Sequence, residues 1–348
     1  MSLLVHHLWY GKDPAARLFR ALLLGPSALY RSIAAGRLLA YRSGLISITR
    51  PGIPVISVGN LSVGGTGKTP LCAWIASYCV TRGITPGVIL RGYGGDEARV
   101  HRILVPQARV VESPDRAAGV LRALEEGAEV AILDDGFQRL DVARDLNVVL
   151  VSAESRHAAP WTVPAGPWRE PFKALSRADF LVVTRRSAPA SEAALVAERG
   201  IGLLGAERVG QVCLAISRLE PLGGGQSVDP EELAGRRVLA VCGIGDPVSF
   251  RAQLASFEAR VELMARRDHH SYNSRDAGRI CAIAPQFDYV VVTLKDSWKL
   301  AGYLDGMREK VLVAHQEIRW EGGLDDFRRC LEGTLAGVAE SEVRIRDL

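Results

Sequence analysis

The chain has 348 residues, 48% of them hydrophobic and 24% charged, a composition typical of globular proteins that excludes a largely disordered chain. This length is more than one core comfortably organises, so we expect two domains. The net charge is +4, but residues 1–50 hold seven basic residues against the single acid Asp13, a balance of +6 that leaves about −2 for the remainder. A basic N-terminal segment on a mildly acidic remainder predicts that the protein binds a negatively charged surface.

The cysteines and the apolar segments indicate a cytosolic protein. Six cysteines are scattered without CxxC spacing, which favours reduced thiols over disulfides or a zinc site. The most apolar segment, residues 18–41, is interrupted by Arg20, Pro26 and Arg31, so we expect it neither to span a bilayer nor to act as a signal peptide.

The first fifty residues contain two helical patterns. Asp13 can cap a first helix that Gly25 and Pro26 end, and Ser27 can cap a second. Apolar residues recur at helical spacing with arginines beside them, which is typical of amphipathic helices in a membrane interface. The same pattern fits two helices packed on the body with solvated arginines. Both interpretations stay open, and the charge asymmetry favours the membrane for residues 1–48.

From Pro54 onward, short β-branched runs alternate with helical patterns, which predicts a parallel sheet covered on both faces. The pattern loosens toward the glycine-rich segment 221–225, and a second α/β stretch follows. We therefore predict an α/β protein with a first domain over residues 1–205 and a smaller α/β domain over residues 206–348. Strands are predicted at residues 55–58, 87–90, 109–111, 130–133, 147–151 and 180–184, and helices near 70–82 and 115–126. The second domain is built from segments 237–242, 248–257, 274–284, 289–293 and 311–315 and a helix near 324–335.

A phosphate-binding loop follows the first predicted strand. Residues 62–69 read Ser-Val-Gly-Gly-Thr-Gly-Lys-Thr, a Walker A sequence with Ser62 in place of the first glycine. The glycines let backbone N–H groups surround phosphate oxygens, and the following helix directs its positive end at the same anion. Lys68 would reach the β- and γ-phosphates, and the Thr69 hydroxyl would bind Mg²⁺. The predicted nucleotide-binding residues are Ser62, Val63, Gly64, Gly65, Thr66, Gly67, Lys68 and Thr69.

A Walker B candidate ends a later strand, where Val-Ala-Ile-Leu leads into Asp134 and Asp135. Side chains alternate along a strand, so at most one aspartate faces the metal squarely, and the other could orient water or the acceptor. Together with the loop, these acids predict a P-loop NTPase-like core.

Two other P-loop classes fit less well. A GTPase would carry an Asn/Thr-Lys-x-Asp motif, and the nearest string, at residues 293–296, has Leu294 at the lysine position. A partitioning-type ATPase would carry a lysine directly before Gly64, where this chain has Val63. Both alternatives are therefore disfavoured.

Several short strings, taken in chain order, resemble the sequences of the tetraacyldisaccharide 4'-kinase family, the kinases of the lipid A pathway. The resemblance covers nearly the whole chain, and no single motif has to support it. The matching strings are residues 9–10, 29–30, 58–70, 91–97, 115–116, 133–138 and 164–171, and in the second domain 268–270, Tyr272, 295–296 and 299–300.

The resemblance implies transfer of the γ-phosphate of ATP to the 4'-hydroxyl of a tetraacyldisaccharide 1-phosphate, a lipid A precursor, with Mg²⁺ as cofactor. It also implies a glycolipid substrate and a peripheral position on the cytoplasmic face of the bacterial inner membrane. We expect no nucleic-acid partner, and no obligate protein partner is evident.

The resemblance also implies residue roles. Asp96 in the first domain and His269 in the second would be the catalytic pair, with Asp96 accepting the proton of the sugar hydroxyl. Glu170 would support the metal that Thr69, Asp134 and Asp135 bind. The implied substrate-binding residues are Asn60, Arg91, Tyr93, Gln138 and Arg169. The chain departs from the family pattern in a much shorter segment between Tyr93 and Asp96, and in Arg139, which stands where a histidine usually follows Phe-Gln.

Two alternatives remain open. One is a P-loop kinase for a soluble sugar or cofactor, with structural N-terminal helices. The other is a membrane-associated NTPase that does not transfer phosphate to an acceptor.

Overall fold

The computed structural model describes residues 3–92 and 95–346 and divides into two compact units. Residues 3–212 and 320–346 form the larger unit, and residues 213–319 form the smaller one. The C-terminal residues from 320 on therefore join the larger unit, whereas the sequence analysis placed everything after residue 205 in the second domain.

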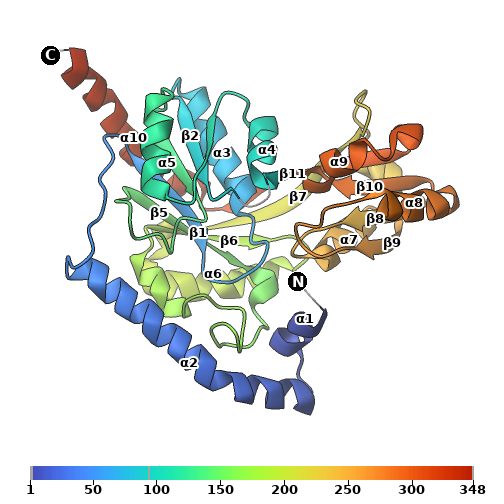
Figure 1. Ribbon diagram of the computed structural model, residues 1–348, viewed down its shortest axis with the longest axis horizontal. Coiled ribbons are helices and arrows are strands. Elements are labelled where there is room, and N and C mark those ends of the chain that lie inside the picture. The colour runs from blue at the N-terminus through green and yellow to red at the C-terminus, as the bar shows by residue number, and fades with distance from the viewer. Residues whose placement is uncertain (1–2, 93–94, 347–348) are drawn as a thin grey trace. The chain divides into compact units, whose positions relative to one another are not determined.

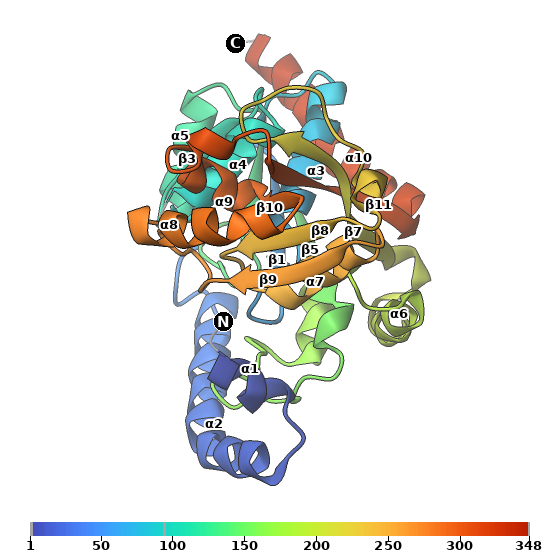
Figure 2. The same ribbon diagram turned by 90° about the vertical axis from the view of Figure 1, so that its right-hand side faces the viewer.

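The N-terminal helices differ from the prediction. α1 (Leu3–Tyr10) precedes α2 (Pro14–Arg42), a long helix of the larger unit, and the two lie side by side where α2 begins (Figures 1 and 2). Asp13 caps α2 as predicted, accepting a hydrogen bond from the Ala16 amide at 3.0 Å. The predicted break at Pro26 is wrong, because α2 continues through it.

A proline inside a helix costs about 3 kcal/mol, because it removes one backbone hydrogen bond and crowds the preceding turn. In α2, a tertiary contact follows the proline directly. Ser27 is buried, and its Oγ lies 2.9 Å from the Thr162 carbonyl oxygen and 2.8 Å from Thr162 Oγ1. This contact fixes the turn after Pro26 and offsets part of the cost. None of the helices in the described parts of the chain is both long and apolar enough to cross a bilayer.

The larger unit contains the predicted parallel sheet, in the order β3-β2-β4-β1-β5-β6. All six strands occur where the sequence predicts them, so the expected α/β core is confirmed. Val58 of β1 is aligned with Asp134 of β4, which brings the carboxyl ends of these strands together. The strands are β1 (Val55–Asn60), β2 (Pro86–Leu90), β3 (Arg109–Glu112), β4 (Val130–Asp134), β5 (Leu146–Ser152) and β6 (Phe180–Arg185).

Helices cover both faces of this sheet. α5 packs on Ile89 and Leu133, and α6 packs on Val149 and Leu181 of the same face. α3 packs on β1, β2 and β4, and Phe327 of α10 lies against Phe180. The bounds of these helices are α3 (Lys68–Thr81), α4 (Asp96–Leu104), α5 (Arg116–Glu125), α6 (Ala190–Leu204) and α10 (Leu324–Arg346).

Gly59 permits a close approach behind the phosphate loop. A Cβ atom on Gly59 would lie 2.4 Å from Phe137 Cβ and 2.6 Å from the Phe137 amide nitrogen. Glycine at this position therefore lets the turn that follows the two aspartates pack against the end of β1.

The smaller unit is built on parallel strands and has its own core. Its strands follow the order β11-β10-β8-β9. α8 and α9 cover one face and α7 covers the other (Figure 2). Two strands, β7 (Val209–Pro221) and β11 (Val311–Gly322), contain residues of both units. The remaining elements are β8 (Arg237–Cys242), α7 (Pro247–Ala255), β9 (Arg260–Ala265), α8 (Ser274–Ile283), β10 (Tyr289–Thr293) and α9 (Leu294–Ala301).

Candidate active site

The phosphate loop runs from the end of β1 to the first turn of α3. Gly64 and Gly67 have φ angles of +124° and +94°, which glycine adopts without the strain other residues would meet. Asn60 Nδ2 donates to Thr66 Oγ1 at 2.9 Å, and the Thr184 hydroxyl donates to the Thr66 carbonyl, also at 2.9 Å. Side chains from β1 and β6 thus hold the loop, while Gly64 and Gly65 at its tip stay exposed. A loop held in this way fits phosphate oxygens.

The structure explains why Ser62 can replace the first glycine. Ser62 forms an isolated antiparallel bridge with Trp168, and the Val63 amide donates to the Pro167 carbonyl at 2.7 Å. Backbone paired in this extended manner does not require glycine. The departure from the Walker A sequence therefore leaves the loop intact.

Asp134 ends β4 beside the first turn of α3. Its Oδ2 accepts a hydrogen bond from Thr69 Oγ1 at 3.3 Å and lies 3.0 Å from His101 Nε2. His101 is fully buried and Asp134 is 3% exposed, so this contact fixes the orientation of the carboxylate. Hydroxyl and carboxylate oxygens placed together are the hard donors that Mg²⁺ prefers.

Asp135 reaches a different part of the loop. Its backbone is left-handed, with φ of 60°, and the residue lies beyond the end of β4. Its Oδ1 is 3.6 Å from Lys68 Nζ, and Arg169 Nη1 donates to both carboxylate oxygens at 2.8 and 2.9 Å. Both aspartates thus contact the Lys-Thr end of the loop, because strand alternation does not extend to Asp135.

The charge of Asp135 is stabilised by its two cationic neighbours. Burial by itself would raise the pKa of the Asp135 carboxyl, but Lys68 and Arg169 outweigh this effect and lower the pKa. Asp135 is therefore an anion that can hold both cations in position at neutral pH.

Gln138 connects several predicted substrate-binding residues. Its Nε2 donates to the Asn60 carbonyl at 2.9 Å and to Glu170 Oε1 at 3.2 Å, and its Oε1 accepts from Arg169 Nη1 at 3.3 Å. Glu170 Oε2 also pairs with Arg177 Nη2 at 2.7 Å. Asn60, Gln138 and Arg169 therefore form one network with Asp135. Glu170 is held by Gln138 and Arg177, and its support of a metal stays a prediction.

A carboxylate that the sequence analysis did not select organises the segment after β6. Glu154 Oε1 accepts the backbone amides of Arg186, Ser187 and Ala188 at 2.7, 3.1 and 3.2 Å. The segment passes beside the phosphate loop, where Arg186 Nη2 lies 3.9 Å from the position that a Cβ on Gly65 would take. Arg186 Nη1 is buried and has no hydrogen-bond partner among the described residues.

The two predicted catalytic residues lie in different units. Asp96 is the first residue of α4 in the larger unit and is 3% exposed. His269 belongs to the smaller unit, has φ of 59°, and places Nε2 3.3 Å from Lys295 Nζ. Their pairing across the units stays a prediction. Of the remaining predicted residues, Arg91 is exposed directly after β2, and Tyr93 lies outside the described residues.

Comparison with known proteins places this chain in a family. Residues 19–335 match the sequence family described as LpxK, tetraacyldisaccharide-1-P 4'-kinase. The chain belongs to this family. It is 36% identical to the tetraacyldisaccharide 4'-kinase of Pelobacter propionicus, over 87% of this chain and 89% of that protein. The corresponding kinase of Geobacter sulfurreducens is also 36% identical, over 83% of this chain and 87% of that protein.

A solved structure has the same fold over nearly the whole chain. The crystal structure of LpxK from Aquifex aeolicus in complex with ATP matches with a TM-score of 0.70 and 29% sequence identity. The match covers 91% of this chain and 99% of that one. The resemblance noted from the motifs is thereby confirmed, and so is the P-loop α/β fold.

In this member of the family, the sequence analysis overlooked His101, Glu154 and Arg186. His101 sits in a helix with no motif around it, and Glu154 and Arg186 are separated by 32 residues, so no local pattern connects them. A fourth residue, Arg116, was noted only as part of a matching string. It is 2% exposed, and its Nη2 donates to the Asp134 carbonyl at 3.3 Å.

Proposed function

We propose that this LpxK family member transfers the γ-phosphate of ATP to the 4'-hydroxyl of a tetraacyldisaccharide 1-phosphate at the cytoplasmic surface of the inner membrane, with Mg²⁺ as cofactor. Family membership supports the reaction. The observation that carries the proposal is the meeting of Lys68, Thr69, Asp134 and Asp135 at one end of the phosphate loop.

The loop would bind the triphosphate through main-chain amides and one ammonium group. The amides of the glycine-rich turn and the N-terminus of α3 supply positive potential for the phosphate oxygens. Lys68 Nζ lies 3.6 Å from Asp135 Oδ1, so a weak ion pair holds the ammonium group over the loop. The half-buried Arg186 places Nη2 beside Gly65, and its buried Nη1 has no hydrogen-bond partner among the described residues, so it supplies a further donor for a nucleotide oxygen.

The donor set suits a magnesium ion bound together with the nucleotide. Thr69 Oγ1 and Asp134 Oδ2 lie 3.3 Å apart, and Asp135 follows directly. When bound there, Mg²⁺ neutralises negative charge on the β- and γ-phosphates. His101 would orient Asp134 for this role, because its ring lies against Oδ2.

The transfer itself needs a base and an acceptor in line with the γ-phosphate. The 4'-hydroxyl oxygen forms a bond to the γ-phosphorus while the bond from that phosphorus to the β,γ-bridging oxygen breaks, and ADP leaves. We assign the hydroxyl proton to Asp96, and we assign to His269 the orientation of Asp96 when the two units close on the substrates. Because the transition state of phosphoryl transfer is loose, base assistance is modest and positioning contributes more.

The exposed face of α2 supports an interfacial position. Six large apolar side chains of this helix are each 60–68% exposed, an arrangement that costs free energy in water and suits the boundary of a bilayer. Arginines of the same helix can reach the lipid phosphates from that depth. The six apolar residues are Leu18, Phe19, Leu22, Leu29, Ile33 and Leu39.

The test is phosphate transfer from ATP to a tetraacyldisaccharide 1-phosphate in detergent micelles. We expect transfer by the wild type, a loss of at least 100-fold in Lys68→Ala, and a loss of kcat in Asp96→Asn of about 100-fold with an unchanged KM for ATP. Asp325→Asn, an exposed carboxylate of α10, is the matched control and should behave as wild type.

Two results would contradict the proposal. Phosphorylation of a soluble sugar or cofactor in preference to the lipid acceptor would favour the soluble-substrate kinase. ATP hydrolysis that is indifferent to the acceptor would favour the non-transferring NTPase. Full activity of Asp96→Asn would remove only the assignment of the base.

A further inference from the structure

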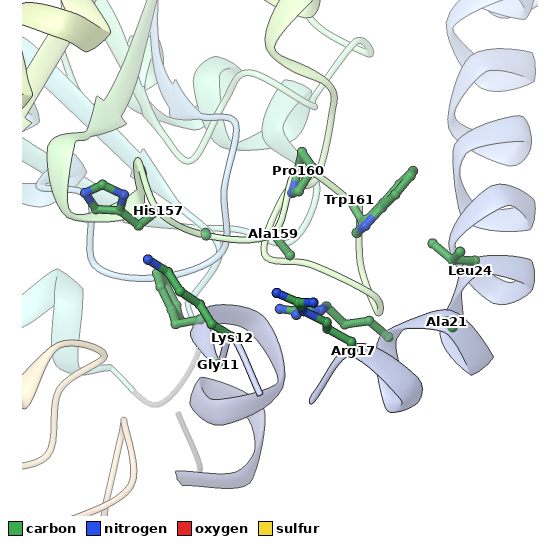
Figure 3. A pocket seen from close by; sticks show the side chains of 12 residues that line it. Gly11, Lys12, Arg17, Ala21, Leu24, His157, Ala159, Pro160 and Trp161 are labelled. Carbon is green, nitrogen blue, oxygen red and sulfur yellow. The ribbon is translucent and has the colours of Figure 1, made fainter. Parts of the chain in front are cut away.

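A cavity of about 400 Å³ lies at the bend between α1 and α2, and the segment 157–161 forms its other wall (Figure 3). Figure 3 shows Lys12 and Arg17 on the helical side, facing the segment that contains His157 and Trp161. All of these residues belong to the larger unit.

The lining of the cavity is strongly cationic. Lys12, Arg17 and Arg20 contribute three permanent positive charges, and none of the described residues that line the cavity carries a carboxylate. Among the described residues, the structure records no ion pair for Lys12 or Arg17, and both side chains are exposed. Three cations at one concave surface favour an anionic ligand that can contact all of them.

The nearby acids already have partners. Asp13 caps α2 through the Ala16 amide and lies 3.0 Å from His7 Nε2. On the other wall, Glu192 Oε2 pairs with Arg156 and lies 3.4 Å from His157 Nε2. Neither carboxylate neutralises Lys12 or Arg17, so the positive potential of the cavity persists.

The walls of the cavity are fixed by hydrogen bonds. Trp9 Nε1 donates to the Pro164 carbonyl at 3.0 Å, and the Ala159 amide donates to the Trp9 carbonyl at 2.9 Å. Arg20 Nη1 donates to the Leu8 carbonyl at 3.1 Å, which holds its guanidinium group at the cavity. The walls of the cavity and the position of Arg20 are therefore built into the fold.

Apolar side chains continue outward from the cavity along α2. Leu18, Phe19 and Leu22 are 60–68% exposed and lie in the turns that also supply Arg17 and Arg20. Trp161, at the rim, is 42% exposed, and tryptophan is enriched at the level of lipid headgroups. A ligand with an anionic head and apolar tails matches this arrangement of charge and apolar surface.

We propose that this cavity binds the phosphate of an anionic phospholipid of the bilayer, with the acyl chains lying along the apolar face of α2. Lys12, Arg17 and Arg20 would contact the phosphate oxygens, and Trp161 would lie beside the glycerol backbone. The cavity is assembled from elements other than the phosphate loop, so its occupant is distinct from the ATP that reacts. The inference rests on the proposed interfacial position of α2.

The test compares two charge-matched double variants of the full-length protein. Lys12→Gln with Arg17→Gln removes two exposed cations from the cavity, and Arg31→Gln with Arg37→Gln removes two exposed cations from the part of α2 outside the cavity. Calorimetric titration with dihexanoyl phosphatidylglycerol below its micelle concentration measures the site without a charged surface. Dihexanoyl phosphatidylcholine and inorganic phosphate are the other probes.

We expect saturable binding of the phosphatidylglycerol probe by the wild type and by the Arg31/Arg37 variant, and binding at least tenfold weaker in the Lys12/Arg17 variant. Equal losses in the two variants, or equal binding of both lipid probes, would overturn the proposal. Inorganic phosphate bound as tightly as the lipid would overturn the assignment to a lipid.

Co-sedimentation with vesicles separates this inference from the proposed membrane position. Binding to vesicles of phosphatidylcholine alone reports the apolar face of α2, and the increase on adding phosphatidylglycerol reports the cations. We expect the Lys12/Arg17 variant to keep its binding to phosphatidylcholine vesicles. Its increase in binding on adding phosphatidylglycerol should fall at least tenfold more than that of the Arg31/Arg37 variant. If the wild type does not bind phosphatidylcholine vesicles but still binds the phosphatidylglycerol probe in the titration, only the interfacial position is refuted.

Discussion

Replacing Glu154 should destabilise the larger unit, because its half-buried carboxylate organises the segment that runs beside the phosphate loop. Its Oε1 accepts three successive backbone amides, from Arg186, Ser187 and Ala188, and Ser152 Oγ donates to Oε2. Burial raises the pKa of Glu154, but the Ser152 hydroxyl, the Arg186 amide and the Arg186 charge together lower it.

The expected magnitude follows from these hydrogen bonds. A hydrogen bond to a charged group contributes about 1.5–3 kcal/mol, but three donors that share one oxygen are not additive. We therefore expect Glu154→Ala to lower the free energy of unfolding by about 3 kcal/mol at pH 7. Glu154→Gln should lower it by about 1–2 kcal/mol, because its carbonyl oxygen can still accept the amides without the charge. For a unit of this size, 3 kcal/mol corresponds to a drop in Tm of about 6–12 °C.

The pH dependence distinguishes the charge from simple packing. A carboxyl whose pKa is lower in the folded state contributes its stability above the unfolded pKa, and the contribution is lost as the pH falls through the folded pKa. The difference in the free energy of unfolding between wild type and Glu154→Gln should therefore be largest at pH 7. It should decrease as the pH falls below 4.5, the ordinary pKa of a glutamate. Urea unfolding followed by tryptophan fluorescence at several pH values measures it.

Glu192→Ala is the control, because its half-exposed carboxylate pairs with Arg156 at the surface, where an ion pair contributes little. The reasoning is refuted if Glu154→Gln is as stable as the wild type at pH 7. It is equally refuted if the difference between the two proteins is unchanged in acid.

The remaining predictions concern the catalytic machinery and its packing. Gly59→Ala should destabilise the protein by about 1–3 kcal/mol in thermal unfolding, because its Cβ would overlap Phe137, whereas Gly25→Ala, which meets no atom within 4 Å, should not destabilise it. Arg186→Met should raise the KM for ATP about tenfold and leave the KM for the lipid acceptor unchanged, since it removes one charged donor beside the loop. His101→Leu should weaken activation by Mg²⁺ by about 10–100-fold in a metal titration of initial rates, and an unchanged metal dependence would refute its role in orienting Asp134. Chelation of divalent metal should abolish transfer, and added Mg²⁺ should restore it.

The sequence alone was sufficient for the local features of this protein. The β-branched runs predicted all six strands of the larger sheet, because a strand buried on both faces is continuously apolar. The order strand, glycine-rich turn, Lys68, Thr69 and helix fixed the phosphate loop, since each part of that motif acts on its immediate neighbours. The string from Leu133 to Gln138 likewise indicated the two acids, Asp134 and Asp135, that contact the phosphate loop.

Only the tertiary structure decided features that depend on residues far apart in the chain. α2 continues through Pro26, and the contact that fixes the following turn joins Ser27 to Thr162, 135 residues away. The C-terminal helix joins the larger unit through Phe327, which lies against Trp74 and Phe180.

The same division holds within the site. Local sequence selects residues whose neighbours along the chain give them a role, whereas Glu154 acts on amides 32 to 34 positions later and His101 on a carboxylate 33 positions later. Adjacent residues can also diverge, as Asp134 and Asp135 do, because a left-handed backbone at Asp135 ends the alternation of the strand. Motifs specified which chemistry is present, and packing between distant segments determined where each group points.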